Sequence, residues 1–185
     1  KNRGMKVEGF DAYVTSNVIG GAGVSSSASF EMLVCVMVDY LFNGGKRDMV
    51  TYAKAGQYAE NKYWMKGSGL LDQLACAVGG IITIDFADIE NPSIPEVNCN
   101  FDELGYDLVI VNTGKGHADL SAEYSAVPNE MKAVARYFGK EVLQQVDEDA
   151  VIENVQAIRK AAGDRAVLRA FHFFEENKRV DAQVK

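Results

Sequence analysis

Strand-like patterns of apolar and polar side chains occur three times along the chain. Residues 10–16 alternate between apolar and polar side chains, which is the period of a half-buried strand. Residues 81–86 follow two glycines and predict a second strand. Residues 107–112 are continuously apolar in their middle, as expected of a strand buried on both faces. The alternation of these segments with helical ones predicts a layered α+β or α/β fold.

Helical periodicity predicts two helices in the first 63 residues. From Ser25 the apolar residues recur three, four, seven, eight and eleven positions apart, which is typical of one helix face. The side chains on this predicted inward face are Phe30, Leu33, Val34, Met37, Val38 and Leu41. Residues 43–45, Asn-Gly-Gly, should end that helix. Asp48 is a suitable cap for the next one, which should run to about Tyr63 and turn Tyr52, Ala55, Tyr58 and Ala59 inward.

The rest of the chain is mostly helical by the same criterion. We expect a short helix over residues 72–78 and longer ones over 129–138, 148–162 and from 164 onward, with Gly139 and Gly163 as separators. The chain begins at Lys1 without an initiator Met and ends at Lys185 inside a predicted helix. We therefore expect the central portion of a longer polypeptide, with an internal boundary near Glu103.

Composition excludes several classes of partner. The chain has 185 residues, of which 48% are hydrophobic, and this is enough to bury a substantial core. A net charge of -7 without a basic patch argues against nucleic acid and anionic membranes as partners. The apolar run 108–111 is far shorter than the roughly 20 residues that cross a bilayer. The 3 widely spaced cysteines predict a reduced, cytoplasmic setting.

The strongest candidate for chemistry is the glycine- and serine-rich loop 20–29, which lies between a predicted strand and a predicted helix. Glycines let backbone N–H groups approach a phosphate, the helix N-terminus adds partial positive charge, and serine hydroxyls supply donors or a metal ligand. An ordinary capped helix after a flexible turn would also explain the loop. It matches neither the G-x-x-x-x-G-K-[ST] nor the G-x-G-x-x-G signature.

This loop and three later segments resemble galactokinases, which belong to the GHMP kinase superfamily. The loop is similar to their ATP-binding motif P-x-G-x-G-L-S-S-S-A, with Ile19 in place of Pro and Val24 in place of Leu. The other matches follow in the family's order. They are Ala59-Glu60-Asn61 with residues 67–73, then residues 111–114 with His117 and Ala122-Glu123-Tyr124, and finally residues 169–172 with residues 175–180.

The resemblance implies a role for each matching position. Ser27 and Glu60 would hold Mg²⁺, Asp72 would be the catalytic base, and the sugar would contact Asp72, Gly69 and Tyr124. The residues that would bind the phosphates of ATP are Gly20, Gly21, Ala22, Gly23, Ser25, Ser26 and Ser27. Without the resemblance, Asp72 would be read as a helix cap, Glu60 as a solvated carboxylate and Tyr124 as a packing residue.

The same resemblance implies a fold and a reaction. The fold would be the α+β two-domain GHMP kinase architecture. A ribosomal-S5-like N-terminal domain would occupy residues 1–103 and a ferredoxin-like C-terminal domain would begin within residues 104–185, both incomplete in this chain. The reaction would be ATP-dependent phosphorylation of galactose to galactose 1-phosphate by a cytoplasmic enzyme, which we expect to be a monomer.

Two alternatives remain open at this point. Another GHMP sugar kinase, for arabinose or galacturonate, would share the phosphate loop and the aspartate, and a non-catalytic galactose and ATP sensor would share the binding residues. The family's N-terminal segment G-R-x-N-x-I-G-E-H-x-D-Y, which supplies most sugar contacts, has no counterpart in these residues. Residues 125–128 also replace the paired arginines that follow the tyrosine in many galactokinases.

Overall fold

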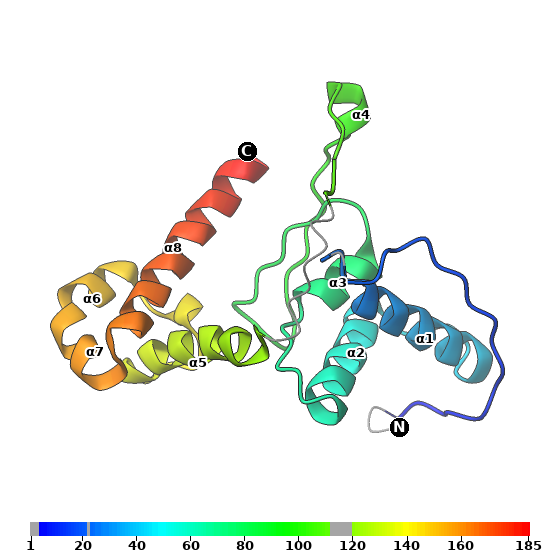
Figure 1. Cartoon of the computed structure of the whole chain (residues 1–185), viewed down its shortest axis with the longest axis horizontal. Helices are drawn as coiled ribbons and strands as arrows, with labels where there is room; N and C mark the ends of the chain where they lie inside the picture. The colour runs from blue at the N-terminus through cyan, green and yellow to red at the C-terminus, as the bar shows by residue number, and fades with distance from the viewer. Residues whose placement is uncertain (1–3, 22, 112–119) are drawn as a thin grey trace. The chain divides into compact units, whose positions relative to one another are not determined.

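The computed structural model describes residues 4–21, 23–111 and 120–185, and these form two compact units (Figure 1). The first unit comprises the described parts of Lys1–Ile82 and Asn98–His117, and the second those of Thr83–Val97 and Ala118–Lys185. The division into domains at residue 103 stays a prediction. Within the described residues, no helix has both the length and the apolar character that a membrane crossing requires.

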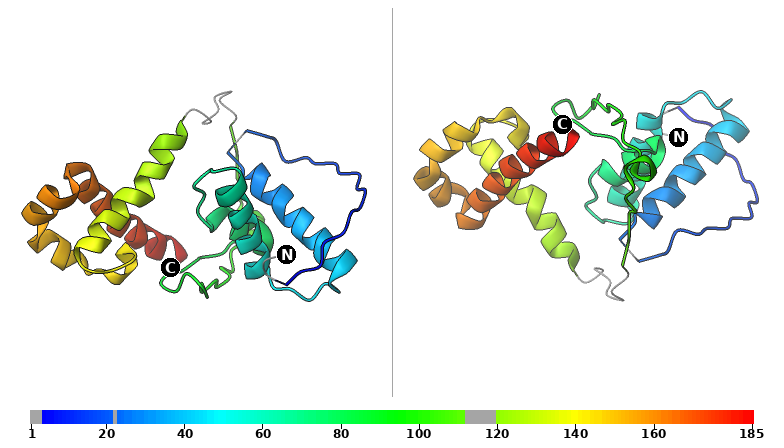
Figure 2. Two further views of the ribbon diagram at one scale, coloured as in Figure 1. Left: turned by 90° about the horizontal axis from the view of Figure 1, so that it is seen from below. Right: turned by 90° about the horizontal axis from the view of Figure 1, so that it is seen from above.

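Three mutually packed helices form the core of the first unit. They are α1 (Ser26–Phe42), α2 (Met49–Tyr63) and α3 (Leu71–Val78), and a fourth short helix, α4, spans Phe101–Leu104. The views in Figures 1 and 2 agree that α1, α2 and α3 lie side by side. Their buried apolar side chains are Ala28, Met32, Val38, Tyr52, Ala53, Leu70 and Leu74.

The ends of α1 and α2 confirm the sequence prediction. Asn43 is the C-cap of α1, and its backbone N–H donates to the Asp39 carbonyl. Asp48 caps α2, because its carboxylate accepts a hydrogen bond of 2.8 Å from the Thr51 backbone N–H. Such caps satisfy backbone groups that have no partner inside the helix.

Helices also make up most of the second unit. They are α5 (Ser121–Tyr137), the 3₁₀ turn η2 (Leu143–Gln145), α6 (Glu148–Glu153), α7 (Val155–Ala162) and α8 (Asp164–Val184). The expected helix over 148–162 is divided, because the Asn154 side chain donates to the Ala150 carbonyl at 2.9 Å and competes with the backbone there. The core is Val134, Ala135, Leu143, Val146, Val151, Ile158, Ala166, Val167, Ala170 and Phe174.

The predicted inward face of α1 is wrong for Phe30, Leu33 and Leu41, whereas Val38 is buried as predicted. Phe30 and Leu41 are 55% and 57% exposed, whereas Ala28 and Met32 on the other side are buried. Both α2 and α3 pack against that other side. There the buried Asp39 carboxylate accepts a hydrogen bond of 2.6 Å from the Tyr52 hydroxyl. Tertiary packing, including this buried polar pair, therefore overrides the apolar stripe.

Two of the expected strands do not form in the described residues, and the third is reduced to a short pairing. Residues 10–16 and 107–111 have no strand partner among these residues, and a strand needs one to satisfy its backbone. Within 81–86, Asp85 pairs with Ser93 through hydrogen bonds of 2.9 and 3.1 Å. The Thr83 backbone N–H also donates to the Pro95 carbonyl at 3.0 Å, but Pro92 and Pro95 lack an N–H and so donate no hydrogen bond to this pairing.

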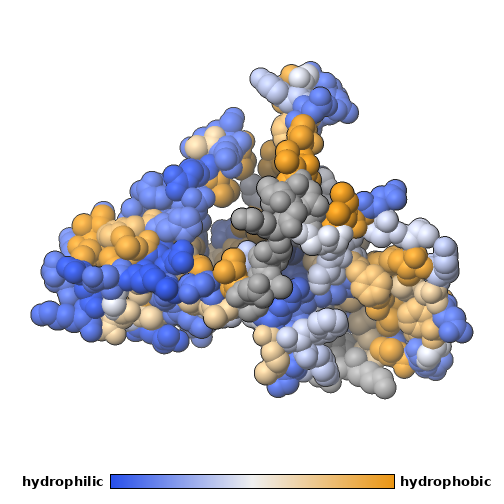
Figure 3. Space-filling model, in the orientation of Figure 1, coloured by the Kyte–Doolittle hydropathy of each residue, from blue (hydrophilic) through white to orange (hydrophobic). Residues whose placement is uncertain are grey.

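Hydrophobic side chains in the segment after α4 are exposed. Leu108, Val109, Ile110 and Val111 are 60–78% exposed. Figure 3 shows hydrophobic surface along the chain that joins α4. The described residues are mostly helical and contain few strand pairings. They do not establish the two-domain α+β architecture.

Candidate functional site

The glycine- and serine-rich loop forms an open turn ahead of α1. Gly21, Gly23 and Ser25 have positive φ values of 74°, 73° and 55°. Turns with such left-handed residues present backbone N–H groups that bind anions. A Cβ at Gly20, Gly21 or Gly23 would meet no atom within 4 Å, so crowding does not require glycine there. Ala22, which we expect to bind phosphate as well, lies outside the described residues.

The N-terminus of α1 carries no side-chain cap. Ser25 occupies the N-cap position but makes no side-chain capping hydrogen bond. The N–H groups of the first turn, which include those of Ser26 and Ser27, lack intrahelical acceptors in any α-helix. Together with the helix dipole, they make this end of α1 suited to a negatively charged group.

A groove adjoins the start of α1. One of its sides is the segment 14–18, and the other is formed by Ser26, Ser29, Phe30 and Leu33. The exposed apolar side of α1 therefore lines a groove next to the loop.

The structure brings Ser27 and Glu60 together, as the sequence predicts. The Ser27 hydroxyl donates a hydrogen bond of 2.8 Å to Glu60 Oε1, which connects α1 to a residue 33 positions later on α2. Glu60 does not lie on the solvent side of its helix, since only 5% of the residue is exposed. A hydroxyl and a carboxylate therefore meet at the end of the glycine-rich loop.

Several donors hold Glu60 in its ionised form. Its Oε1 accepts a hydrogen bond of 2.6 Å from Lys66 Nζ, and its Oε2 accepts one of 3.2 Å from Gln73 Nε2. Burial by itself would raise the pKa of Glu60, but hydrogen bonds from Lys66, Ser68 and Ser27 outweigh it and lower this pKa to about 2. The carboxylate is therefore charged at neutral pH.

Glu31 and Gln73 belong to the same cluster and were missed as site residues. Gln73 Nε2 also donates to Glu31 Oε2 at 3.2 Å, while Gln73 Oε1 is buried without a hydrogen-bond partner in the described structure. Burial raises the pKa of Glu31. Glu31 lies four residues after Ser27, and this spacing places the two side chains on one helix face, which is the signal that could have identified it.

Gly56 lets the helices carrying this cluster approach closely. A Cβ at Gly56 would lie 2.7 Å from Glu31 Oε2, 2.7 Å from Met32 Cε and 3.3 Å from Gln73 Cγ. Gly56 is in the middle of α2, where glycine otherwise weakens a helix. The absence of a side chain at position 56 therefore leaves room on α2 for the Glu31, Met32 and Gln73 side chains.

Replacing Gly56 by Ala is expected to destabilise the protein by about 1–3 kcal/mol, because the new methyl group overpacks the cluster. At an uncrowded helix position the same change stabilises by roughly 0.5–1 kcal/mol. Urea denaturation of wild type and Gly56→Ala would measure the difference. An increase in stability would contradict the crowding at this position.

The other predicted site residues lie at the surface. Asp72 is exposed in the first turn of α3, whose N-cap is Leu70, so Asp72 does not cap this helix. Gly69 is exposed just before it, and a Cβ there would meet no atom within 4 Å. Tyr124 belongs to α5 in the second unit and is 55% exposed. The matched residues 112–114 and His117 lie outside the described residues.

The Ser27 hydroxyl and the Glu60 carboxylate are oxygen ligands, and they fit a hard cation that also binds other ligands. Magnesium prefers oxygen ligands and is commonly held by one or two protein groups together with phosphates and waters. Across the described ranges, no group of three or more His, Cys, Asp or Glu side chains could hold a metal ion. Phosphates and waters would supply the remaining ligands of a cation bound by Ser27 and Glu60.

The sequence of this chain is similar to one family model and to several curated proteins. Residues 1–80 match the family model described as GHMP kinases N terminal domain. The chain is 32% identical to a galactokinase of Clostridium tetani (strain Massachusetts / E88) over 184 residues, which are 97% of this chain and 45% of the relative.

Two further relatives give the same result. A galactokinase of Actinobacillus pleuropneumoniae serotype 5b (strain L20) is 31% identical over 94% of this chain and 44% of its own length. A galactokinase of Limosilactobacillus reuteri (strain DSM 20016) is 30% identical over 100% of this chain and 48% of its own length. The chain thus spans about half the length of these curated relatives. No solved structure matches it.

Proposed function

We propose, from the premise that residues 1–80 match the N-terminal domain of GHMP kinases, that the protein transfers the γ-phosphoryl group of ATP to the anomeric hydroxyl of galactose. The observation that carries the proposal is the 2.8 Å hydrogen bond between Ser27 and Glu60. It joins the end of an anion-binding loop to a buried, ionised carboxylate. The resemblance to galactokinases extends over most of the chain and supports galactose as the acceptor.

The phosphates of ATP would lie at the N-terminus of α1. The residues that would bind them are Gly20, Gly21, Ala22, Gly23, Ser25, Ser26 and Ser27. The uncapped first turn of α1 supplies backbone N–H donors without any prior rearrangement. Phosphoryl transfer relies mainly on positioning and charge stabilisation, and fixed donors of this kind provide both.

Ser27 and Glu60 would hold Mg²⁺, which supplies charge neutralisation on the phosphates when bound. Glu60 is suited to this role because its position is fixed by three donors and its charge is preserved at neutral pH. Gln73 aligns the second carboxylate oxygen of Glu60. The first oxygen and the Ser27 hydroxyl would then be the ligands of Mg²⁺.

Asp72 would act as the base that orients and accepts the proton of the acceptor hydroxyl. A general base must be reachable by substrate, and Asp72 is exposed. Gly69, where a side chain would meet open space, leaves room for a sugar next to Asp72. Tyr124 is proposed as a further sugar contact, within the two-domain GHMP architecture that the resemblance implies.

The proposed setting is a cytoplasmic monomer, and the cysteines Cys35, Cys76 and Cys99 are unpaired.

A coupled assay of ADP release by the full-length protein tests the proposal. With ATP and Mg²⁺, we expect turnover on galactose to exceed turnover on arabinose, galacturonate and glucose. Greater turnover on one of the other sugars would assign a different GHMP sugar kinase. Galactose binding without turnover on any of the four would assign a sensor.

A further inference from the structure

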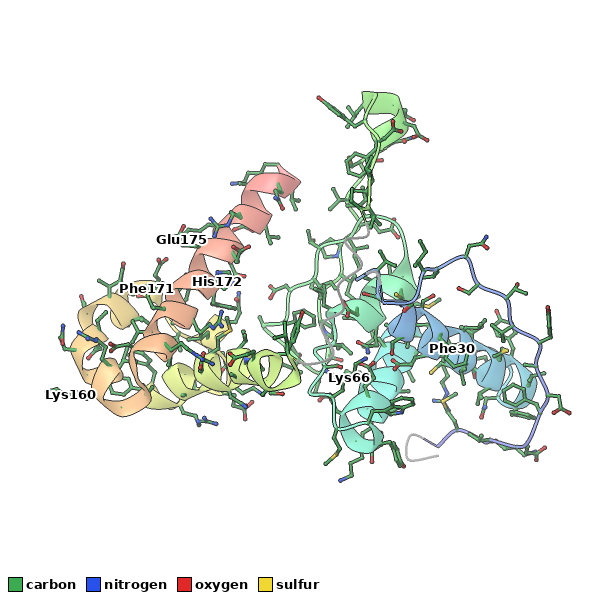
Figure 4. The ribbon with its side chains drawn as sticks, in the orientation of Figure 1. Phe30, Lys66, Lys160, Phe171, His172 and Glu175 are labelled. Atoms are coloured by element: carbon green, nitrogen blue, oxygen red, sulfur yellow. The ribbon has the colours of Figure 1, made fainter. Side chains whose placement is uncertain are left out.

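Lys66 lies at the cluster formed by Ser27 and Glu60, although neither the phosphate loop nor the catalytic base requires it. Its ammonium group donates to Glu60 Oε1 at 2.6 Å. The Lys66 side chain is 49% exposed, whereas that of Glu60 is 7% exposed. Lys66 therefore lies between a buried carboxylate and the solvent. Figure 4 labels Lys66 next to α2.

The chain between the two residues is shaped to return this lysine to α2. Met65 adopts a left-handed conformation with φ 54°, which is costly for a residue with a side chain. The Lys66 backbone N–H donates to the Glu60 carbonyl at 3.3 Å, so backbone and side chain of Lys66 both contact the same residue. Ser68 and Asn61 then anchor the loop through hydrogen bonds of 2.6 and 3.0 Å.

The ammonium group occupies the place where a cation would bind Glu60. Lys66 Nζ and Ser27 Oγ both hydrogen bond to the same oxygen, Glu60 Oε1. A metal ion ligated by Ser27 and Glu60 would approach that oxygen as well. Two positive charges within a few ångströms of one another repel strongly when they are partly shielded from water. Simultaneous binding of the ammonium group and a metal ion to Glu60 Oε1 is therefore unfavourable.

We propose that Lys66 is the resident counterion of Glu60 in the nucleotide-free protein, and that a divalent cation must displace its ammonium group from the carboxylate. This inference rests on the proposed metal site at Ser27 and Glu60. An unpaired buried carboxylate is unfavourable, and Lys66 removes that penalty while the site holds no metal. Because Lys66 is half exposed, its ammonium can move into water when it is displaced. Lys66 thus acts as a positioning residue that sets the affinity for the metal.

The test is Mn²⁺ binding to the full-length, nucleotide-free protein, with free Mn²⁺ counted by electron paramagnetic resonance. Lys66→Met keeps the aliphatic length and removes the charge. We expect it to bind Mn²⁺ about two- to fivefold more tightly than wild type, which corresponds to loss of a partly exposed ion pair. Lys66→Arg should behave like wild type. Damage to the structure would weaken metal binding, so a gain in affinity is specific to displacement.

Two further variants separate this inference from the metal site itself. Lys62→Met removes one positive charge at an exposed position near the end of α2, the helix that carries Glu60. It should leave the affinity for Mn²⁺ nearly unchanged. Glu60→Gln should lower it. The role of Lys66 is overturned if Lys66→Met binds Mn²⁺ no more tightly than wild type, or if Lys62→Met gains as much affinity as Lys66→Met. Neither result would contradict the proposed metal site. No effect of Glu60→Gln overturns the proposed metal site and this inference with it.

Discussion

Replacing Asp72 by Asn is expected to lower turnover of the full-length protein by roughly 10²–10⁴-fold, which is the typical contribution of a positioned general base. Asn has the size of Asp but cannot accept the proton of the sugar hydroxyl. Asp72 is exposed in the first turn of α3 and is not the cap of that helix. Its replacement therefore removes little that stabilises the fold.

Melting temperature and nucleotide affinity serve as controls for this variant, and both should stay close to those of wild type. The assay is ADP release with galactose and Mg²⁺ at saturating ATP. Near wild-type turnover of Asp72→Asn would defeat the catalytic role. A parallel loss of turnover and melting temperature would instead make Asp72 a structural residue.

Replacing Leu74 by Ala should cost about 2–5 kcal/mol of folding free energy, as large-to-small changes in a packed core generally do. Leu74 is 0% exposed on α3, which packs on both α1 and α2. The lost methyl groups would leave a cavity among three helices that carry the phosphate loop, Glu60 and Asp72. Urea denaturation followed by circular dichroism measures the loss.

Leu71→Ala is the matched control, because it makes the same chemical change three residues earlier on the same helix. Leu71 is 57% exposed, so its truncation should change the stability by about 0.5 kcal/mol or less. If the two variants lost similar stability, the packing of α3 described here would be wrong.

Helix ends could be predicted from the sequence because short-range chemistry determines them. Asp48 accepts a hydrogen bond from a backbone three residues away, and Asn43 follows directly on the last turn of α1. The buried side of α1 could not be predicted in the same way. It depends on Asp39, whose buried carboxylate accepts hydrogen bonds from the Arg47 backbone N–H and from the hydroxyl of Tyr52 on another helix. Neither partner is visible in the periodicity of α1.

The strand predictions were wrong for a related reason. An alternating or apolar run shows that a segment is suited to a sheet, but a strand also needs a neighbour at hydrogen-bonding distance. Residues 10–16 have none in the described structure, and Phe10 packs instead on Phe42 with ring centroids 6.0 Å apart. Sequence periodicity contains no information about such a neighbour.

The candidate site was partly accessible from the sequence. The resemblance to galactokinases pointed to Ser27 and Glu60, and the structure places them in contact. Gln73 follows Asp72 directly in the sequence, yet it is buried and donates to Glu31 and Glu60. Side chains of consecutive helical residues point about 100° apart, so Asp72 faces solvent while Gln73 faces the other helices. Lys66 escaped notice because only its loop conformation directs it to Glu60.

The exposed apolar run 108–111 has a consequence for how the protein behaves in concentrated solution. Its four side chains are 60–78% exposed, and its backbone has no ladder partner in the described structure. Extended, β-prone and uncharged segments of this kind pair with their own copies and start aggregates. Wherever this run stays uncovered, we expect it to promote self-association of the protein.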